Sequence, residues 1–186
     1  MIIRHPEKNI FSKIKKYTTK PIINAGDGDG EHPTQALLDL YTVLDYYPNY
    51  PSKIAFTGDI KYSRTIHSLI YLLTKLTKDI KFYFIINNEL GLTEELLNHL
   101  KNYDYYIFDN IELIINEIDV LYVTRLQKER FLNENCNNLI IDKKLIRNSK
   151  ENLIILHPLP RNEELSTDLD NNPKSKYFEQ VENGIF

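Results

Sequence analysis

The sequence predicts an α/β fold, a three-layer sandwich in which helices cover both faces of a mostly parallel sheet. Short apolar runs of strand length alternate with amphipathic segments of helical period, and the connections between them are short. This alternation is typical of parallel strands joined by crossover helices, which bury the sheet on both sides. With 42% hydrophobic and 26% charged residues, the chain has the apolar content for such a core.

The first predicted helix lies in the basic segment 8–20. Ile10, Phe11 and Ile14 recur there at helical spacing, so the lysines are expected on a solvated face.

The segment 24–35 is the most informative in the chain. Its three glycines lie within five residues, which predicts a loop where the backbone turns sharply or approaches a small molecule. A helix is predicted to follow at once, because Pro33 suits a first helical turn. His32 and Gln35 are therefore expected at a helix N-terminus, where unpaired N–H groups favour an anion. The apolar residues of this helix are Leu37, Leu38, Tyr41 and Leu44.

The sheet is predicted to begin after a candidate linker at 48–51. Apolar runs predict strands at 53–59 (ending in a loop), 82–86, 105–108, 120–124 and 153–156. Helical periodicity predicts helices at 65–76, 93–100, 110–118, 142–148 and from 177 onwards. The expected N-caps are Thr93, Asn110 and Asp142.

Polar and cationic residues follow three of the predicted strands, at 59–64, 125–127 and 157–161. Ligands of parallel sheets bind beyond the carboxyl ends of the strands, so these segments are expected to meet. A guanidinium group places two N–H groups on a carboxylate or phosphate. Several arginines at strand ends, in a chain of net charge −3, predict a site for small, multiply charged anions.

Several classes of protein are disfavoured. The net charge provides no global basic field for nucleic acid, and no apolar run approaches the ~18 residues of a membrane span. The single cysteine, Cys136, excludes a disulfide within the chain and a cysteine-based zinc site. Residues 1–4 lack the apolar core of a signal peptide. The expectation is a cytoplasmic protein that binds neither nucleic acid nor membrane.

Five motifs, taken in order, closely resemble the aspartate carbamoyltransferase family. They are Asn-Ala-Gly-Asp-Gly at 24–28, His-Pro-Thr-Gln at 32–35, Gly-Asp-Ile-Lys-Tyr-Ser-Arg-Thr-Ile-His-Ser-Leu at 58–69, Tyr-Val-Thr-Arg-Leu-Gln-Lys-Glu-Arg at 122–130 and His-Pro-Leu-Pro-Arg at 157–161. The resemblance extends from residue 3 to residue 186. It implies transfer of a carbamoyl group from carbamoyl phosphate to L-aspartate, in pyrimidine biosynthesis, without a metal, organic cofactor or covalent intermediate.

The resemblance also implies which residues bind the donor, carbamoyl phosphate. Arg4 would hold the phosphate and polarise the carbamoyl oxygen, and His32, as a neutral donor, would hydrogen-bond to the same oxygen. Gln35 would hold the carbamoyl nitrogen. The backbone carbonyls of Leu159 and Pro160 would orient the same group.

On the acceptor side, the resemblance assigns Arg64 to the α-carboxylate of aspartate and Arg125, helped by Gln127, to the β-carboxylate. Ornithine carbamoyltransferase is the nearest alternative, since it shares the His-Pro-Thr-Gln segment. That family has a cysteine after the histidine of the last motif, where this chain has Pro158. Arg125 would also repel the cationic side chain of ornithine, so aspartate is the expected acceptor.

The chain departs from the family pattern in what it lacks. The family's Ser-Thr-Arg-Thr phosphate-binding segment occurs nowhere in the 186 residues. The expected division is therefore 1–35 as a remnant of the carbamoyl-phosphate domain, 36–49 as a connecting helix, 50–178 as the aspartate domain and 179–186 as the start of a truncated helix. This chain alone is expected to be inactive, and the complete protein to be an active homotrimer. A non-catalytic binding or scaffold module derived from the family is the second hypothesis.

Overall fold

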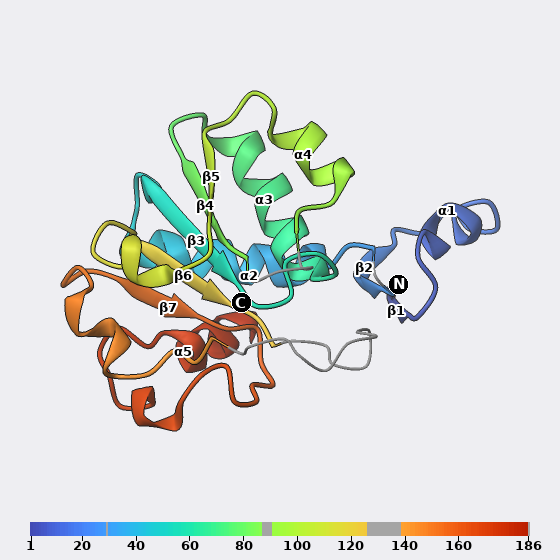
Figure 1. The fold of residues 1–186 in the computed structure, drawn as a ribbon. Coiled ribbons are helices and arrows are strands. Elements are labelled where there is room, and N and C mark those ends of the chain that lie inside the picture. Colours follow the sequence, from blue (N-terminus) through green and yellow to red (C-terminus); the bar gives the residue numbers. More distant parts are fainter. Residues whose placement is uncertain (29, 87–90, 126–138, 186) are drawn as a thin grey trace.

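The computed structural model describes residues 1–28, 30–86, 91–125 and 139–185 (Figure 1). Within these ranges the chain forms a large sheet covered on both faces and a small N-terminal sheet beside it. No described helix has the length and apolar content to cross a bilayer.

The large sheet contains five strands in the order β5-β4-β3-β6-β7, and every neighbouring pair is parallel. The strands are β3 (Lys53–Thr57), β4 (Lys81–Ile85), β5 (Tyr105–Phe108), β6 (Val120–Val123) and β7 (Ile154–Leu156). In the central strand, Ile54 is in register with Phe82 of β4 and Val120 of β6. All five strands were predicted, with bounds that differ by at most two residues, because each is an apolar run.

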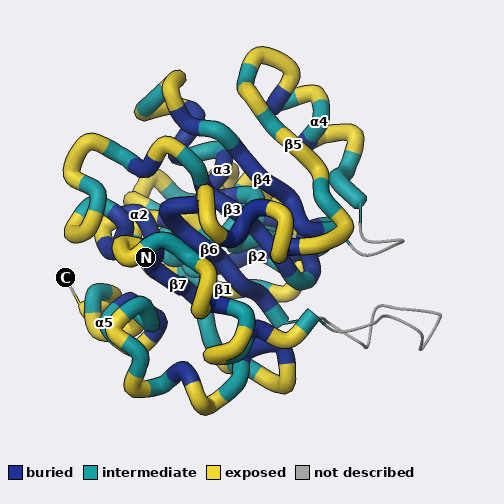
Figure 2. Tube along the Cα trace, turned by 60° about the vertical axis from the view of Figure 1, so that its left-hand side comes forward, coloured by how far each residue is buried: buried dark blue, intermediate teal, exposed yellow. Residues whose placement is uncertain are grey.

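Alternate residues of the strands form two separate hydrophobic cores. Ile54 and Phe56 pack with the helices of one face, whereas Ala55 faces the other core. The helices of the first face are α2 (Pro33–Tyr46), α3 (Arg64–Leu76) and α4 (Glu94–Leu100). The second face is covered by the short helix α5 (Tyr177–Glu182) and the 3₁₀ turns η1 (Ile111–Leu113), η3 (Leu145–Asn148) and η4 (Thr167–Leu169). The predicted three-layer α/β architecture is confirmed, and Figure 2 shows the buried sheet between these layers.

The predictions of α-helices at 110–118 and 142–148 are wrong. Asn110 is the N-cap as predicted, because its Oδ1 accepts from Glu112 N at 2.9 Å. Asp142 Oδ1 accepts from Leu145 N at 2.8 Å, but the N-cap of the turn that follows is Lys144. Only 3₁₀ turns follow. Successive tight turns bury the same apolar positions that an α-helix would bury. The spacing of apolar residues in the sequence therefore did not distinguish 3₁₀ turns from an α-helix.

The N-terminal region differs from the predicted loop and helix. β1 (Ile2–His5) pairs in parallel with β2 (Ile23–Asp27), so the first glycine of the 24–35 segment lies in a strand. The helix in 8–20 is limited to α1 (Ile10–Ile14), none of whose residues is buried. At the other end of the chain, α5 is followed by the 3₁₀ turn η5 (Asn183–Ile185).

Candidate functional site

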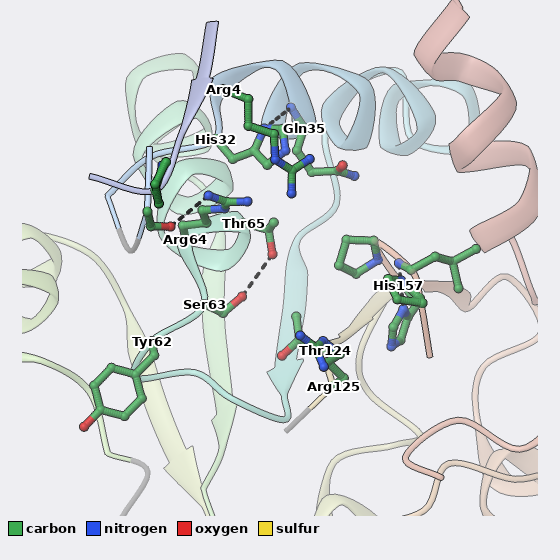
Figure 3. Close-up of a pocket in the computed structure, with 15 residues that line it drawn as sticks. Arg4, His32, Gln35, Tyr62, Ser63, Arg64, Thr65, Thr124, Arg125 and His157 are labelled. Atoms are coloured by element: carbon green, nitrogen blue, oxygen red, sulfur yellow. Dashed lines mark hydrogen bonds between the residues drawn. The ribbon is translucent and has the colours of Figure 1, made fainter. Parts of the chain in front are cut away.

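A cavity of about 790 Å³ lies where β3, β6 and β7 end, beside β1 and the start of α2 (Figure 3). Seven of the eight predicted site residues line it: Arg4, His32, Gln35, Arg64, Arg125, Leu159 and Pro160. The eighth, Gln127, lies outside the described residues. Lining residues that were not assigned a role from the sequence are Pro6, Gly28, Tyr62, Ser63, Thr65, Thr124, His157 and Pro158. Arg161, from the same strand-end segment as Pro160, is directed elsewhere, since its guanidinium donates to Asp170 and Tyr177.

The start of α2 fixes the ring of His32. This residue is the N-cap, and its Nδ1 accepts from Gln35 N at 3.4 Å. A ring nitrogen that accepts a hydrogen bond carries no proton, so in the neutral ring the proton is on Nε2. Burial, reinforced by the charges of Arg64 and Arg4, lowers the pKa of His32 to about 4. The imidazole is therefore a neutral N–H donor at neutral pH.

Arg64 lies at the first turn of α3, directly after the N-cap Ser63. One of its guanidinium nitrogens donates to the backbone oxygen of Gly28 at 2.8 Å. A Cβ on Gly26 would lie 3.1 Å from the guanidinium carbon, and Gly26 has φ +116°. The positive φ therefore favours glycine here, and a Cβ would require the guanidinium to shift by a few tenths of an ångström.

Arg125 follows Thr124 at the end of β6. Thr124 N donates to Thr57 O at 3.0 Å, which continues the pairing of β6 with β3 beyond the strand ends. Gly58, with φ +98°, permits this approach, since a Cβ there would lie 1.9 Å from Thr124 O. The close contact brings the segments carrying Arg64 and Arg125 to one edge of the sheet.

The loop after β7 is held by its buried histidine. Nδ1 of His157 accepts from Leu159 N at 2.9 Å, and Nε2 lies 2.9 Å from Glu164 Oε1. The first contact leaves the ring proton on Nε2, which donates to the carboxylate. His157 N also donates to Gln180 Oε1 at 2.9 Å. These contacts fix the backbone of the loop at Leu159.

A buried carboxylate lies behind the cavity, on α2. Asp39 accepts hydrogen bonds from Gln35, Tyr122 and Gln180. Burial raises the pKa of Asp39 to about 6, although these three donors favour the ionised form. Sequence reasoning missed this residue. The available signal was an aspartate at position i+4 from Gln35 among the apolar residues of a helix.

The cavity is electropositive. Arg4, Arg64 and Arg125 contribute three guanidinium groups, and no described lining residue is acidic, in a chain of net charge −3. Figure 3 shows Arg4, His32 and Gln35 on one side of the cavity and Thr124 and Arg125 on another. No cluster of three potential metal-ligating side chains occurs among the described residues. The arrangement suits a ligand with several separated negative charges.

Two family models match successive parts of the chain. Residues 51–186 match the aspartate/ornithine carbamoyltransferase, Asp/Orn binding domain. Residues 1–45 match the carbamoyl-P binding domain of the same family.

Individual relatives agree with the family models. The aspartate carbamoyltransferase catalytic subunit of Methanobrevibacter smithii is 44% identical over 193 residues, covering 100% of this chain and 60% of the relative. That of Methanocaldococcus jannaschii is 42% identical over 193 residues, with 100% and 62% covered. Aspartate transcarbamoylase from Trypanosoma cruzi in complex with carbamoyl aspartate and phosphate superposes with a TM-score of 0.92 at 35% identity, covering 99% of this chain and 61% of that one. The chain thus spans about three-fifths of the length of these relatives.

Proposed function

Because this chain belongs to the aspartate/ornithine carbamoyltransferase family, we propose that the protein transfers the carbamoyl group of carbamoyl phosphate to L-aspartate. The products are N-carbamoyl-L-aspartate and phosphate, which makes this a step of pyrimidine biosynthesis. The observation that supports this proposal best is the single cavity in which Arg4, Arg64 and Arg125 meet a neutral His32 with no described acidic side chain. Together the two substrates carry one phosphate and two carboxylates, so the three anionic groups equal the three guanidinium groups in number and are opposite to them in charge.

In the proposed reaction the aspartate amine attacks the carbamoyl carbon. A C–N bond forms, the C–O bond to phosphate breaks with its electron pair leaving on phosphate, and the amine loses a proton to the departing phosphate. Negative charge develops on the carbamoyl oxygen, where Arg4 and the Nε2–H of His32 donate. One such preorganised donor typically lowers the barrier by ~3 kcal/mol. Gln35 and the carbonyls of Leu159 and Pro160 hold the carbamoyl nitrogen.

The acceptor is selected by the other two arginines. Arg64 binds the α-carboxylate of aspartate, and Arg125, helped by Gln127, binds the β-carboxylate. An ornithine side chain would bring a cation to Arg125, so the charge of this side chain disfavours the ornithine-specific branch of the family. The T. cruzi relative has been crystallised with carbamoyl phosphate and aspartate, and with N-(phosphonacetyl)-L-aspartic acid, which supports the same substrates here.

The organisation of the complete protein is part of the same proposal. Residues 1–35 belong to the carbamoyl-phosphate side, 36–49 connect the two sides, 50–178 bind aspartate and 179–186 belong to a C-terminal segment that follows the start of α5 at Tyr177. The active protein is a cytoplasmic homotrimer with sites between subunits, as the family resemblance implies. Without the Ser-Thr-Arg-Thr segment, residues 1–186 alone do not sustain transfer.

Calorimetry on residues 1–186 tests the proposal. N-(phosphonacetyl)-L-aspartate is titrated into the chain, and the same phosphonacetyl group on L-ornithine is the matched control. We expect measurable heat with the aspartate compound and at least tenfold weaker binding of the ornithine compound. Heat with neither would favour a non-catalytic scaffold, and a preference for the ornithine compound would reverse the assignment of the acceptor.

A further inference from the structure

The buried Asp39 connects two parts of the cavity wall that are far apart in the sequence. Its Oδ1 accepts from Gln35 Nε2 at 2.8 Å and from Gln180 Nε2 at 2.5 Å, and its Oδ2 accepts from Tyr122 OH at 2.6 Å. Asp39, Tyr122 and Gln180 are each 0% exposed, so water does not compete for these contacts. Gln180 lies on α5, and Gln35 precedes Asp39 by one turn of α2.

An ionised carboxylate only accepts hydrogen bonds, which fixes the orientation of both amides. If the Gln35 amide turned over, its Oε1 would face Asp39 Oδ1, and two acceptors would meet in a buried place. The NH₂ group of Gln35 therefore stays on Asp39. Oε1 is the acceptor that this side chain offers to the cavity, which Gln35 lines.

The Gln180 amide is fixed from both ends. Its NH₂ group donates to Asp39, and its Oε1 accepts from His157 N at 2.9 Å. Turning this amide over would place its NH₂ group against the His157 N–H. His157 in turn fixes the loop by accepting from Leu159 N. Asp39 thus holds the Gln35 side chain directly and the loop of Leu159 through Gln180.

We propose that Asp39 is a positioning residue that makes this part of the cavity select a ligand with an NH₂ group over the same ligand with a methyl group. The inference rests on the proposed function, because it assumes that the carbamoyl nitrogen faces Gln35. An NH₂ group donates to Gln35 Oε1, whereas a methyl group of nearly the same size leaves that oxygen without a partner. Asp39 itself does not touch the ligand.

The test compares N-carbamoyl-L-aspartate with N-acetyl-L-aspartate, which differ only by NH₂ and CH₃. Both are titrated calorimetrically into residues 1–186 in the presence of inorganic phosphate. The unmodified chain is expected to prefer the carbamoyl compound by about tenfold, the usual effect of one well-placed hydrogen bond in a desolvated site. In Asp39→Leu the Gln35 amide is no longer fixed, and the preference is expected to fall below about twofold.

Tyr122→Phe is the matched control. It removes one buried hydrogen bond to Asp39 but leaves both contacts to Oδ1. Because loss of this donor raises the pKa of Asp39 above about 6, all titrations are run at pH 8, where the carboxylate stays ionised and the tenfold preference should remain. Damage to the fold lowers the affinity for both compounds together, whereas the ratio reports the orientation of the amide.

Each outcome has a defined meaning. Equal binding of both compounds to the unmodified chain overturns the inference and leaves the proposed function standing, and it needs no variant that folds. A preserved preference in folded Asp39→Leu also overturns it. Binding of neither compound contradicts the proposed function, and the inference falls with it.

Discussion

The N-terminal region of residues 1–32 and the sheet region of residues 50–185 line the same cavity, but they are stabilised in different ways. The sheet region buries two hydrophobic cores, one on each face of its five strands. The N-terminal region has a two-stranded sheet, and its helix α1 has no buried residue. Yet Arg4 and His32 come from the N-terminal region, and Arg64 and Arg125 come from the sheet region.

The comparison shows that polar contacts attach the N-terminal side of the site to the sheet region. His32 N donates to Ser68 Oγ of α3 at 2.9 Å, and Arg64 of α3 donates to Gly28 O at 2.8 Å. Helix α2 joins the two regions, since it begins at the cavity and packs against α3 and α5. The donor side thus has little hydrophobic core of its own, and its position relative to the acceptor side depends on these contacts.

The largest expected effect is on stability, and it tests whether only the sheet region has a hydrophobic core. Ile54 is 0% exposed in the central strand, whereas Ile2 of β1 is 74% exposed. Ile54→Ala should lower the free energy of unfolding by about 2–5 kcal/mol, because it removes buried methylene groups and leaves a cavity. Ile2→Ala should change it by no more than about 0.5 kcal/mol. Urea denaturation followed by circular dichroism measures both, and equal costs would show that Ile2 is buried in an associated form of the chain.

A second test concerns ligand binding on the sheet side. Arg125→Ala should weaken binding of N-(phosphonacetyl)-L-aspartate by ~2–3 kcal/mol, because a charge-assisted hydrogen-bonded pair with the β-carboxylate is lost. Arg147→Ala is the control, since this exposed arginine lies in η3 and not among the residues lining the cavity. Isothermal titration gives both affinities. If the two variants bind equally well, Arg125 does not hold the β-carboxylate.

The accuracy of prediction from the sequence also differs between the two regions. The strands of the sheet region were predicted closely because a strand buried on both faces is an apolar run that local sequence reveals. The gathering of Arg64 and Arg125 followed from the rule for carboxyl ends of parallel strands. In the N-terminal region, β1 and β2 were not predicted, since neither Ile-Ile-Arg-His nor Ile-Asn-Ala-Gly-Asp is an apolar run of strand length.

What could not be predicted depends on contacts between distant residues. Asp39 and Gln180 are 141 positions apart, and no local pattern pairs them. The turns η1 and η3 were predicted as helices because tight turns and helices place apolar residues at similar spacing. The role predicted for Gln127 remains a prediction, since this residue lies outside the described ranges.

A third test addresses the place where the two regions touch. Gly26→Ala adds a Cβ at 3.1 Å from the Arg64 guanidinium, on a backbone with φ +116°. We expect a loss of about 1–3 kcal/mol in stability from the strained backbone. Weaker binding of N-(phosphonacetyl)-L-aspartate should accompany it, because Arg64 must move. Gly91→Ala is the matched control, since a Cβ there meets no atom within 4 Å. Thermal unfolding measures the stability of both variants, and calorimetry measures their affinity for N-(phosphonacetyl)-L-aspartate. An unchanged affinity in Gly26→Ala would show that the position of Arg64 does not depend on this glycine.

The smallest expected effect is the change in the pKa of His32 when one of the two nearby arginines is replaced, an electrostatic effect that links the two regions. Burial and the charges of Arg64 and Arg4 lower the pKa of His32 to about 4, so an NMR titration of its ring should show a midpoint near 4. Because this folded-state pKa lies below the ordinary 6.5, the unfolded chain takes up the proton first, and unfolding becomes easier as the pH falls from 6.5 towards 4. Arg64→Gln should raise the midpoint more than Arg4→Gln, since the sheet-side arginine contributes the larger charge effect. A midpoint near 6.5 in the unmodified chain would mean that His32 is not the neutral donor proposed here, and that the N-terminal region does not hold it against the sheet region as described.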